Sequence, residues 1–113
     1  QPMFALGSSA LNDRARAPMA RVAPVIARLP NAIAIAGHTD ATPFRGQGSN
    51  WDLSADRANA TRRLLSEAGI ADSRIRSVAG HAERDPLLPD QPNAAANRRV
   101  SITLIRQQAE APR

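Results

Sequence analysis

The strongest structural pattern in the chain is the segment AIAIAGHTD, residues 32–40. In its first six residues large and small side chains alternate with a period of two, which predicts a central strand with Ile33 and Ile35 on one face. Its last three residues are polar and continue beyond the strand. Residues 41–50 contain one proline and two glycines and predict a loop. Polar side chains therefore stand where a strand meets a loop, a common place for ligand sites in open sheets.

A helix is predicted after this loop, from about Trp51 to Ala68. Asn50 or Asp52 would cap its N-terminus, and Gly69 would end it. Its apolar stripe comprises Leu53, Ala60, Thr61, Leu64 and Ala68.

A second helix is predicted before the central strand, over residues 12–29. The residues expected on its apolar face are Val22, Val25, Ile26 and Leu29. Pro24 lies inside this periodic stretch and should kink or divide the helix.

Three further strands are predicted. Residues 3–6 form a short apolar segment, and residues 74–82 and 98–106 form the other two strands, separated by an irregular stretch rich in proline. The last strand places Val100, Ile102 and Leu104 on one face. The order strand, helix, strand, helix, strand, loop, strand predicts an α/β (α+β) two-layer sandwich with its helices on one side of the sheet.

The composition fits one small domain over residues 1–113, with a core from about residue 3 to 106 and a flexible tail over 107–113. Of the 113 residues 42% are hydrophobic, and 23 of these 48 are alanine, so 25 larger apolar side chains remain for a single core. The longest apolar run, residues 32–36, is far short of a membrane span. Cysteine is absent, which excludes disulfides and thiolate metal sites. With no leader at Gln1, we expect the chain to be cut from a longer protein.

The net charge of +5 raises the possibility of nucleic-acid binding. All 15 basic residues are arginine, spread from Arg14 to Arg113 with never more than two adjacent. The three aromatic side chains that could stack on bases lie outside arginine-rich runs. We therefore expect no nucleic-acid partner, and we keep a basic nucleic-acid binder only as a rival interpretation.

Arg57 lies four residues after Leu53 and so on the inward face of its helix, where a guanidinium must find an acceptor. The obvious acceptor is Asp40. Together they could hold a zwitterionic ligand, with Arg57 on its carboxylate and Asp40 on its ammonium. The alternative is an internal ion pair between helix and sheet. Arg98 is a second cation that alternation turns inward, where it could share Asp40, and its alternative is an exposed strand end.

Catalysis and metal binding find little support in the residues. His38 and His81 each follow a glycine, but no metal-binding spacing such as His-x-x-x-His is present, so we expect no metal and no cofactor. A nucleophile elbow and a close pair of carboxylates are also missing. We expect no enzymatic activity. The rival is a wall-acting enzyme that uses His38 and Asp40 as acid and base.

Three motifs together resemble the OmpA-like peptidoglycan-binding domain. They are Gly37-His38-Thr39-Asp40, the segment NWDLSADRA at residues 50–58, and Asn97-Arg98-Arg99-Val100, in family order. The resemblance covers about residues 3–106. It implies a βαβαββ fold with a mixed four-stranded sheet and helices packed on one face.

The resemblance also implies a site. Asp40 would bind the ammonium and Arg57 the carboxylate of diaminopimelate in the peptide stem of the wall. Thr39, Asn50, Leu53 and Arg98 would shape the pocket. Binding would be non-covalent, with no bond broken.

Within the family the loop sequence is most similar to that of the MotB group of flagellar stator proteins. The similarity rests on residues 37–44 and on the segment SNWDLS at residues 49–54. It implies a periplasmic domain of an inner-membrane protein from a Gram-negative bacterium, anchoring a motor stator to peptidoglycan. A homodimer and a MotA-type subunit, reached through an N-terminal part absent here, are the implied protein partners. The alternative is an OmpA- or Pal-like tether of an outer-membrane protein or lipoprotein.

Overall fold

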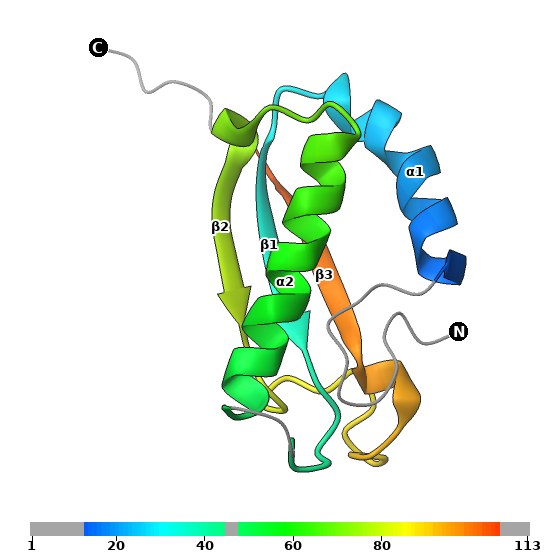
Figure 1. The fold of residues 1–113 in the computed structure, drawn as a ribbon, viewed down its shortest axis with the longest axis vertical. Coiled ribbons are helices and arrows are strands. Elements are labelled where there is room, and N and C mark those ends of the chain that lie inside the picture. Colours follow the sequence, from blue (N-terminus) through cyan, green and yellow to red (C-terminus); the bar gives the residue numbers. More distant parts are fainter. Residues whose placement is uncertain (1–12, 45–47, 107–113) are drawn as a thin grey trace.

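Three strands form one sheet in the computed structural model, which describes residues 13–44 and 48–106 (Figure 1). Their order is β2-β1-β3. The strands are β1 (Ala32–His38), β2 (Ile75–Gly80) and β3 (Arg99–Ile105). The helices are α1 (Asp13–Ala27) and α2 (Asn50–Glu67), with short 3₁₀ turns η1 (Asp72–Arg74) and η2 (Ala95–Asn97).

The central position of β1 agrees with its sequence pattern. It runs parallel to β2, with Ile35 opposite Val78, and antiparallel to β3, with Ile35 opposite Ile102. The sheet is therefore mixed, as expected, but over residues 13–44 and 48–106 it contains three strands and not the predicted four. The strand predicted at residues 3–6 lies outside the described residues.

Helix α2 begins with a capping box. The N-cap is Ser49, and neither Asn50 nor Asp52 occupies that position. The Ser49 hydroxyl accepts from the backbone N–H of Trp51 at 3.2 Å, and the Asp52 carboxylate accepts from the backbone N–H of Ser49 at 2.8 Å. The helix stops at the predicted place, because Gly69 adopts φ +98°, which lets its own N–H and that of Ile70 cap the last carbonyls.

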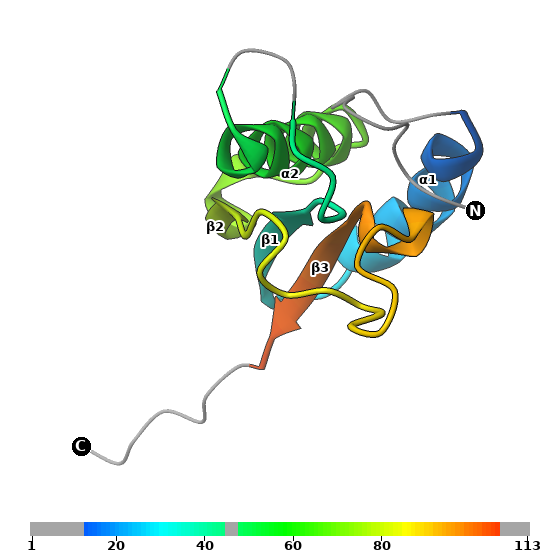
Figure 2. The same cartoon turned by 90° about the horizontal axis from the view of Figure 1, so that it is seen from below.

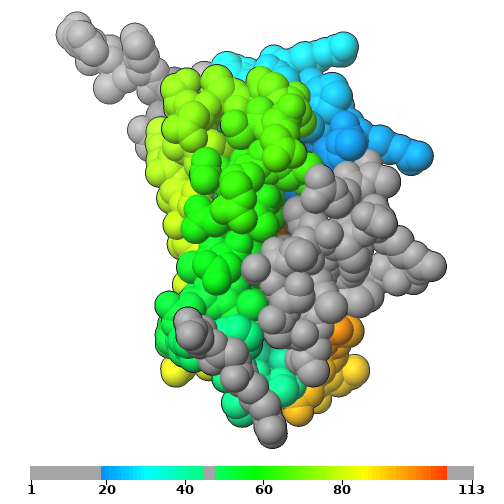
Figure 3. Space-filling model, viewed as in Figure 1, coloured from blue at the N-terminus to red at the C-terminus, as the bar shows by residue number. Residues whose placement is uncertain are grey.

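Both α-helices pack on the same face of the sheet (Figures 1 and 2). The buried apolar core comprises Ala23, Ile26, Ile33, Ile35, Ala58, Leu65, Ile70 and Val100. Helix α2 lies along β1 and β2, and its outer side is exposed over its length (Figure 3). No helix in the part of the chain that the structure describes is long and apolar enough to cross a membrane.

The predicted apolar face of α1 is wrong in three of its four residues. Ile26 is buried, but Val25 is 60% exposed and Val22 and Leu29 are exposed as well. The buried stripe instead joins Met19, Ala23 and Ile26 at spacings of four and three. Alanine at the centre of this stripe allows a close approach but gives a weak hydrophobic signal. The helix also continues through Pro24 without division.

Two glycines bring the sheet close to α2. A Cβ added at Gly37 of β1 would overlap the backbone carbonyl oxygen of Ser54, and one at Gly80 of β2 would overlap the Ser54 hydroxyl. This hydroxyl donates to the carbonyl of Trp51 and accepts from the N–H of Ala82. The first turns of α2 are thus pressed onto the ends of β1 and β2, where the candidate site lies.

Candidate functional site

Asp40 is buried just beyond the end of β1, with 3% of its surface exposed. Its Oδ1 accepts from the backbone N–H of Thr42 at 3.0 Å, a local turn contact. Its Oδ2 accepts from Nη1 of Arg98 at 2.9 Å, and the Arg98 side chain is 14% exposed. The structure thus confirms that Arg98 turns inward and pairs with Asp40.

Arg57 is fully buried on the inner side of α2, as its position in the stripe predicts. Its Nη1 donates to the carbonyl oxygen of His38 at 3.0 Å. Burial and the nearby Arg98 lower the pKa of Arg57 to about 10, against the opposing attraction of Asp40. The guanidinium remains charged at neutral pH. Arg98 is the guanidinium that pairs with the Asp40 carboxylate, and the repulsion of Arg57 by Arg98 outweighs the attraction of Arg57 by Asp40.

Thr39 joins the end of β1 to the segment that follows β2. Its backbone N–H donates to the carbonyl of Ala82 at 2.9 Å. The next link is the N–H of Ala41, which donates to the carbonyl of Pro92 at 2.8 Å. Figure 2 shows this later segment, in yellow, crossing the lower end of the sheet on its way to η2. The residues on either side of Asp40 in the chain, Thr39 and Ala41, are therefore both fixed by backbone hydrogen bonds to the segment that follows β2.

Asn97 organises the loop that reaches Ala41. Its side chain is fully buried, accepts from the N–H of Leu88 at 2.8 Å and donates to the carbonyl of Gln91 at 2.9 Å. A weaker contact reaches the carbonyl of Pro92 at 3.3 Å. The side-chain amide thus supplies hydrogen-bond partners to backbone groups that no helix or strand satisfies in this stretch.

Asn97→Ala is expected to lower the free energy of unfolding by about 1–3 kcal/mol, because the backbone N–H of Leu88 and the carbonyl of Gln91 lose their partner, the buried Asn97 amide. Urea unfolding followed by circular dichroism measures this loss. The matched control is Asn93→Ala, since Asn93 is exposed in the same segment. Equal stabilities of the two variants would contradict the role given to Asn97.

Asn50 and Leu53 belong to the first turn of α2. The Nδ2 of Asn50 donates to Oε2 of Glu83 at 2.8 Å and to the carbonyl of Thr42 at 3.2 Å. The first of these hydrogen bonds is the main reason that the pKa of Glu83 is lowered. Leu53 is buried.

An open pocket of about 430 Å³ lies beside this turn. It is lined by Ala41, Pro43, Phe44, Gly48, Ser49, Asn50, Trp51 and Glu83. Of the six predicted binding residues, Asn50 alone lines this particular pocket, and the other five do not. Glu83 is a site residue that sequence reasoning missed, since its contact with Asn50 spans 33 positions of the chain.

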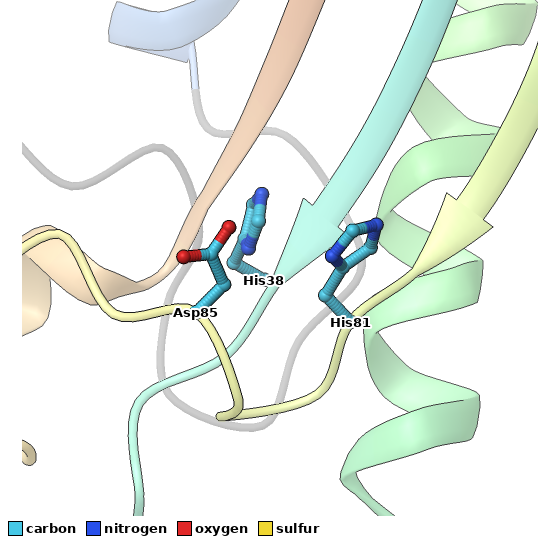
Figure 4. Close-up of side chains that lie close together, drawn as sticks. All are labelled: His38, His81 and Asp85. Atoms are coloured by element: carbon cyan, nitrogen blue, oxygen red, sulfur yellow. The ribbon is translucent and has the colours of Figure 1, made fainter.

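The two histidines, considered separately in the sequence, lie together. Their ring centroids are 5.2 Å apart, and Asp85 lies close to both (Figure 4). The pKa of His38 is lowered to about 4, mainly by burial and to a smaller extent by the positive charges of Arg99 and His81. The negative charge of Asp85 acts in the opposite direction and raises this pKa. His38 is therefore neutral at neutral pH, and its Nε2 lies 3.1 Å from the Ser101 hydroxyl.

The structure thus brings together Asp40, Arg57 and Arg98, with Thr39 directly adjoining. The order of the chain alone could not place His81 and Asp85 beside His38. The pairing of β1 with β2 does so, because Gly37 lies opposite Gly80 and each histidine follows its glycine.

The sequence and the fold of this chain both resemble those of known proteins. Residues 3–99 match the profile of the OmpA family. Motility protein B of Escherichia coli (strain K12) is 41% identical over 113 residues, which cover 97% of this chain and 37% of that protein. This chain therefore spans little more than a third of that relative.

Solved structures share the fold. The C-terminal domain of Helicobacter pylori MotB superposes with a TM-score of 0.83 at 24% identity, covering 96% of this chain and 87% of that one. The cell wall anchor of the T6SS from Pseudomonas aeruginosa gives a TM-score of 0.77 at 26% identity, covering 93% and 76%. Since the family profile extends over most of the sequence and the fold agrees, the chain belongs to the OmpA family.

Proposed function

We propose that this chain binds peptidoglycan non-covalently at the end of the sheet where β1 and β2 finish. Asp40 and Arg57 would hold the diaminopimelate of a stem peptide, and Thr39, Asn50, Leu53 and Arg98 would shape the site. The observation that carries this proposal is the buried Asp40 carboxylate beside two guanidiniums at the strand end.

The charges of the site are suited to a zwitterion. Two arginines beside one aspartate leave an excess positive charge, which a ligand carboxylate would neutralise at Arg57 through the planar guanidinium. Asp40 already accepts from Arg98, but a carboxylate has about four acceptor positions and can accept a ligand ammonium as well. Both charged groups at the free end of diaminopimelate would then be compensated.

The cellular role would be the anchoring of a flagellar motor stator to the wall from the periplasm. The similarity to Motility protein B supports this role, and the whole protein would act with a MotA-type subunit and a second copy of itself. No bond is broken in such a role. Copurification of the full-length protein with a MotA-type subunit would test it.

A second role is favoured by the likeness to the secretion-system cell wall anchor. The same fold could tether a different envelope assembly, as an OmpA- or Pal-like domain does. Full-length protein that copurifies with an outer-membrane or secretion component, and not with a MotA-type subunit, would favour this second role.

The ligand is tested by titrating the domain calorimetrically with a stem tripeptide that ends in diaminopimelate. The control peptide has lysine at the third position, which keeps the side-chain ammonium but lacks the second carboxylate. We expect the lysine peptide to bind at least about 10-fold more weakly, because the buried Arg57 would lose its anionic partner. Equal affinities for the two peptides would exclude Arg57 as the carboxylate-binding residue.

A further inference from the structure

A second cluster of polar side chains lies at the same end of the sheet, on a different set of residues. His38 ends β1, His81 directly follows β2, and Asp85 lies in the next turn of chain (Figure 4). One possible ligand atom from each residue lies within 4.8 Å of the others. The register of the parallel strands explains why the two histidines meet.

His38 offers a buried ring nitrogen that could ligate a metal ion. The residue is 3% exposed, and its Nδ1 is buried without a hydrogen-bond partner among the residues that the structure describes. Its Nε2 lies 3.1 Å from the Ser101 hydroxyl. If Nε2 carries the proton and donates to Ser101, the lone pair of Nδ1 is left free. Metal-binding histidines commonly have this arrangement, with one nitrogen oriented by a hydrogen bond and the other on the metal.

We propose that His38, His81 and Asp85 bind a divalent transition-metal ion of the zinc class. Two imidazole nitrogens and one carboxylate form a donor set suited to Zn²⁺, Co²⁺ or Ni²⁺, with the fourth position left to solvent. A tetrahedral ion with bonds of about 2.0–2.2 Å needs donors about 3.3 Å apart, so the cluster must contract. Asp85 is exposed and His81 only partly buried, so both can move toward the fixed His38.

The charges around the cluster act in both directions. Asp85 contributes a carboxylate, while Arg99 on β3 opposes a cation and donates through Nη2 to the backbone carbonyl of Asp85 at 3.0 Å. Removing the opposing charge by Arg99→Gln is therefore expected to tighten metal binding several-fold.

Metal binding would connect the end of β1 to the loop that follows β2. His38 lies two residues before Asp40, and its carbonyl accepts from Arg57. The metal would therefore stabilise the backbone that positions the proposed wall-binding residues, although its binding does not depend on that function.

The test uses the whole chain after dialysis against a chelator. Titration with ZnCl₂ is expected to show one site per chain, and saturating Zn²⁺ should raise Tm by several degrees, because the ion binds the folded state. Co²⁺ should give the visible absorption of a tetrahedral site. Mg²⁺ should have no effect, since it prefers oxygen ligands in octahedral geometry.

Variants identify the ligands. His81→Ala should abolish the one-to-one binding, and Asp85→Asn should weaken it about 10-fold. The matched control is Asp90→Asn, because Asp90 is an exposed acidic residue of the same connecting segment. This variant should bind Zn²⁺ like the unaltered chain. Because Asp85 is exposed, Asp85→Asn is expected to fold normally, and it therefore tests the site even if His81→Ala fails to fold.

The proposal is overturned if the unaltered chain binds no Zn²⁺ at 1:1 stoichiometry, at a concentration of about 100 μM. It is also overturned if Asp85→Asn binds as tightly as Asp90→Asn, or if folded His81→Ala retains the site.

Discussion

Gly37→Ala is expected to lower the free energy of unfolding by about 3 kcal/mol or more, enough to leave much of the domain unfolded. A Cβ at this position would overlap the carbonyl oxygen of Ser54 and lie 2.9 Å from its carbonyl carbon and 3.1 Å from the N–H nitrogen of Ala58. All three atoms belong to the backbone of α2, so no side-chain rotation can relieve the overlap. Urea unfolding measured by circular dichroism gives the change.

The matched control for this substitution is Gly69→Ala. Nothing lies within 4 Å of a Cβ at Gly69, so its cost comes only from the positive φ of +98° and should be about 1 kcal/mol. A Gly37→Ala variant that is no less stable than Gly69→Ala would show that α2 does not pack this closely on β1.

Asp40→Asn is expected to weaken binding of the diaminopimelate peptide by at least about 30-fold, since truncating one partner of a buried charged contact costs several kcal/mol. Asparagine keeps one oxygen, which can accept from the backbone N–H of Thr42 so that the local turn contact remains, while its NH2 group replaces the oxygen that accepts from Arg98. It removes the charge that the ligand ammonium needs. Calorimetry with the same peptide measures the loss.

Asp56→Asn is the control for Asp40→Asn, because Asp56 is an exposed carboxylate on the outer side of α2. It should bind the peptide normally. The unfolding curve of Asp40→Asn must be recorded as well. If this variant unfolds, the charges serve chiefly as an internal ion pair that joins helix and sheet, which is the alternative that the sequence left open.

The central strand and α2 could be predicted because each has a strong local pattern. Alternation of isoleucine and alanine marks β1, and helical spacing places Arg57 on the inner side of α2. The inward orientation of Arg98 is predicted from alternation in the last strand, although the structure begins β3 at Arg99 and Arg98 directly precedes it. These features depend on neighbours within a few residues, where periodicity is informative.

Other features depend on tertiary packing that a local pattern does not contain. The buried face of α1 centres on Ala23, and the larger Val25 is exposed instead. The N-cap differs from these cases, because Ser49 followed three residues later by Asp52 is a capping-box pattern that is present in the local sequence and was missed. The cluster of His81 and Asp85 with His38 depends on strand register, which brings together residues more than 40 positions apart.

Co-sedimentation of this domain with purified peptidoglycan sacculi tests the central claim most directly, with the unaltered chain beside Asp40→Asn and circular dichroism as the folding check. The account predicts that the unaltered domain pellets with the sacculi and that the folded Asp40→Asn variant stays in solution. If both pellet alike, the arginine-rich surface binds the wall without the proposed site, and the account is contradicted.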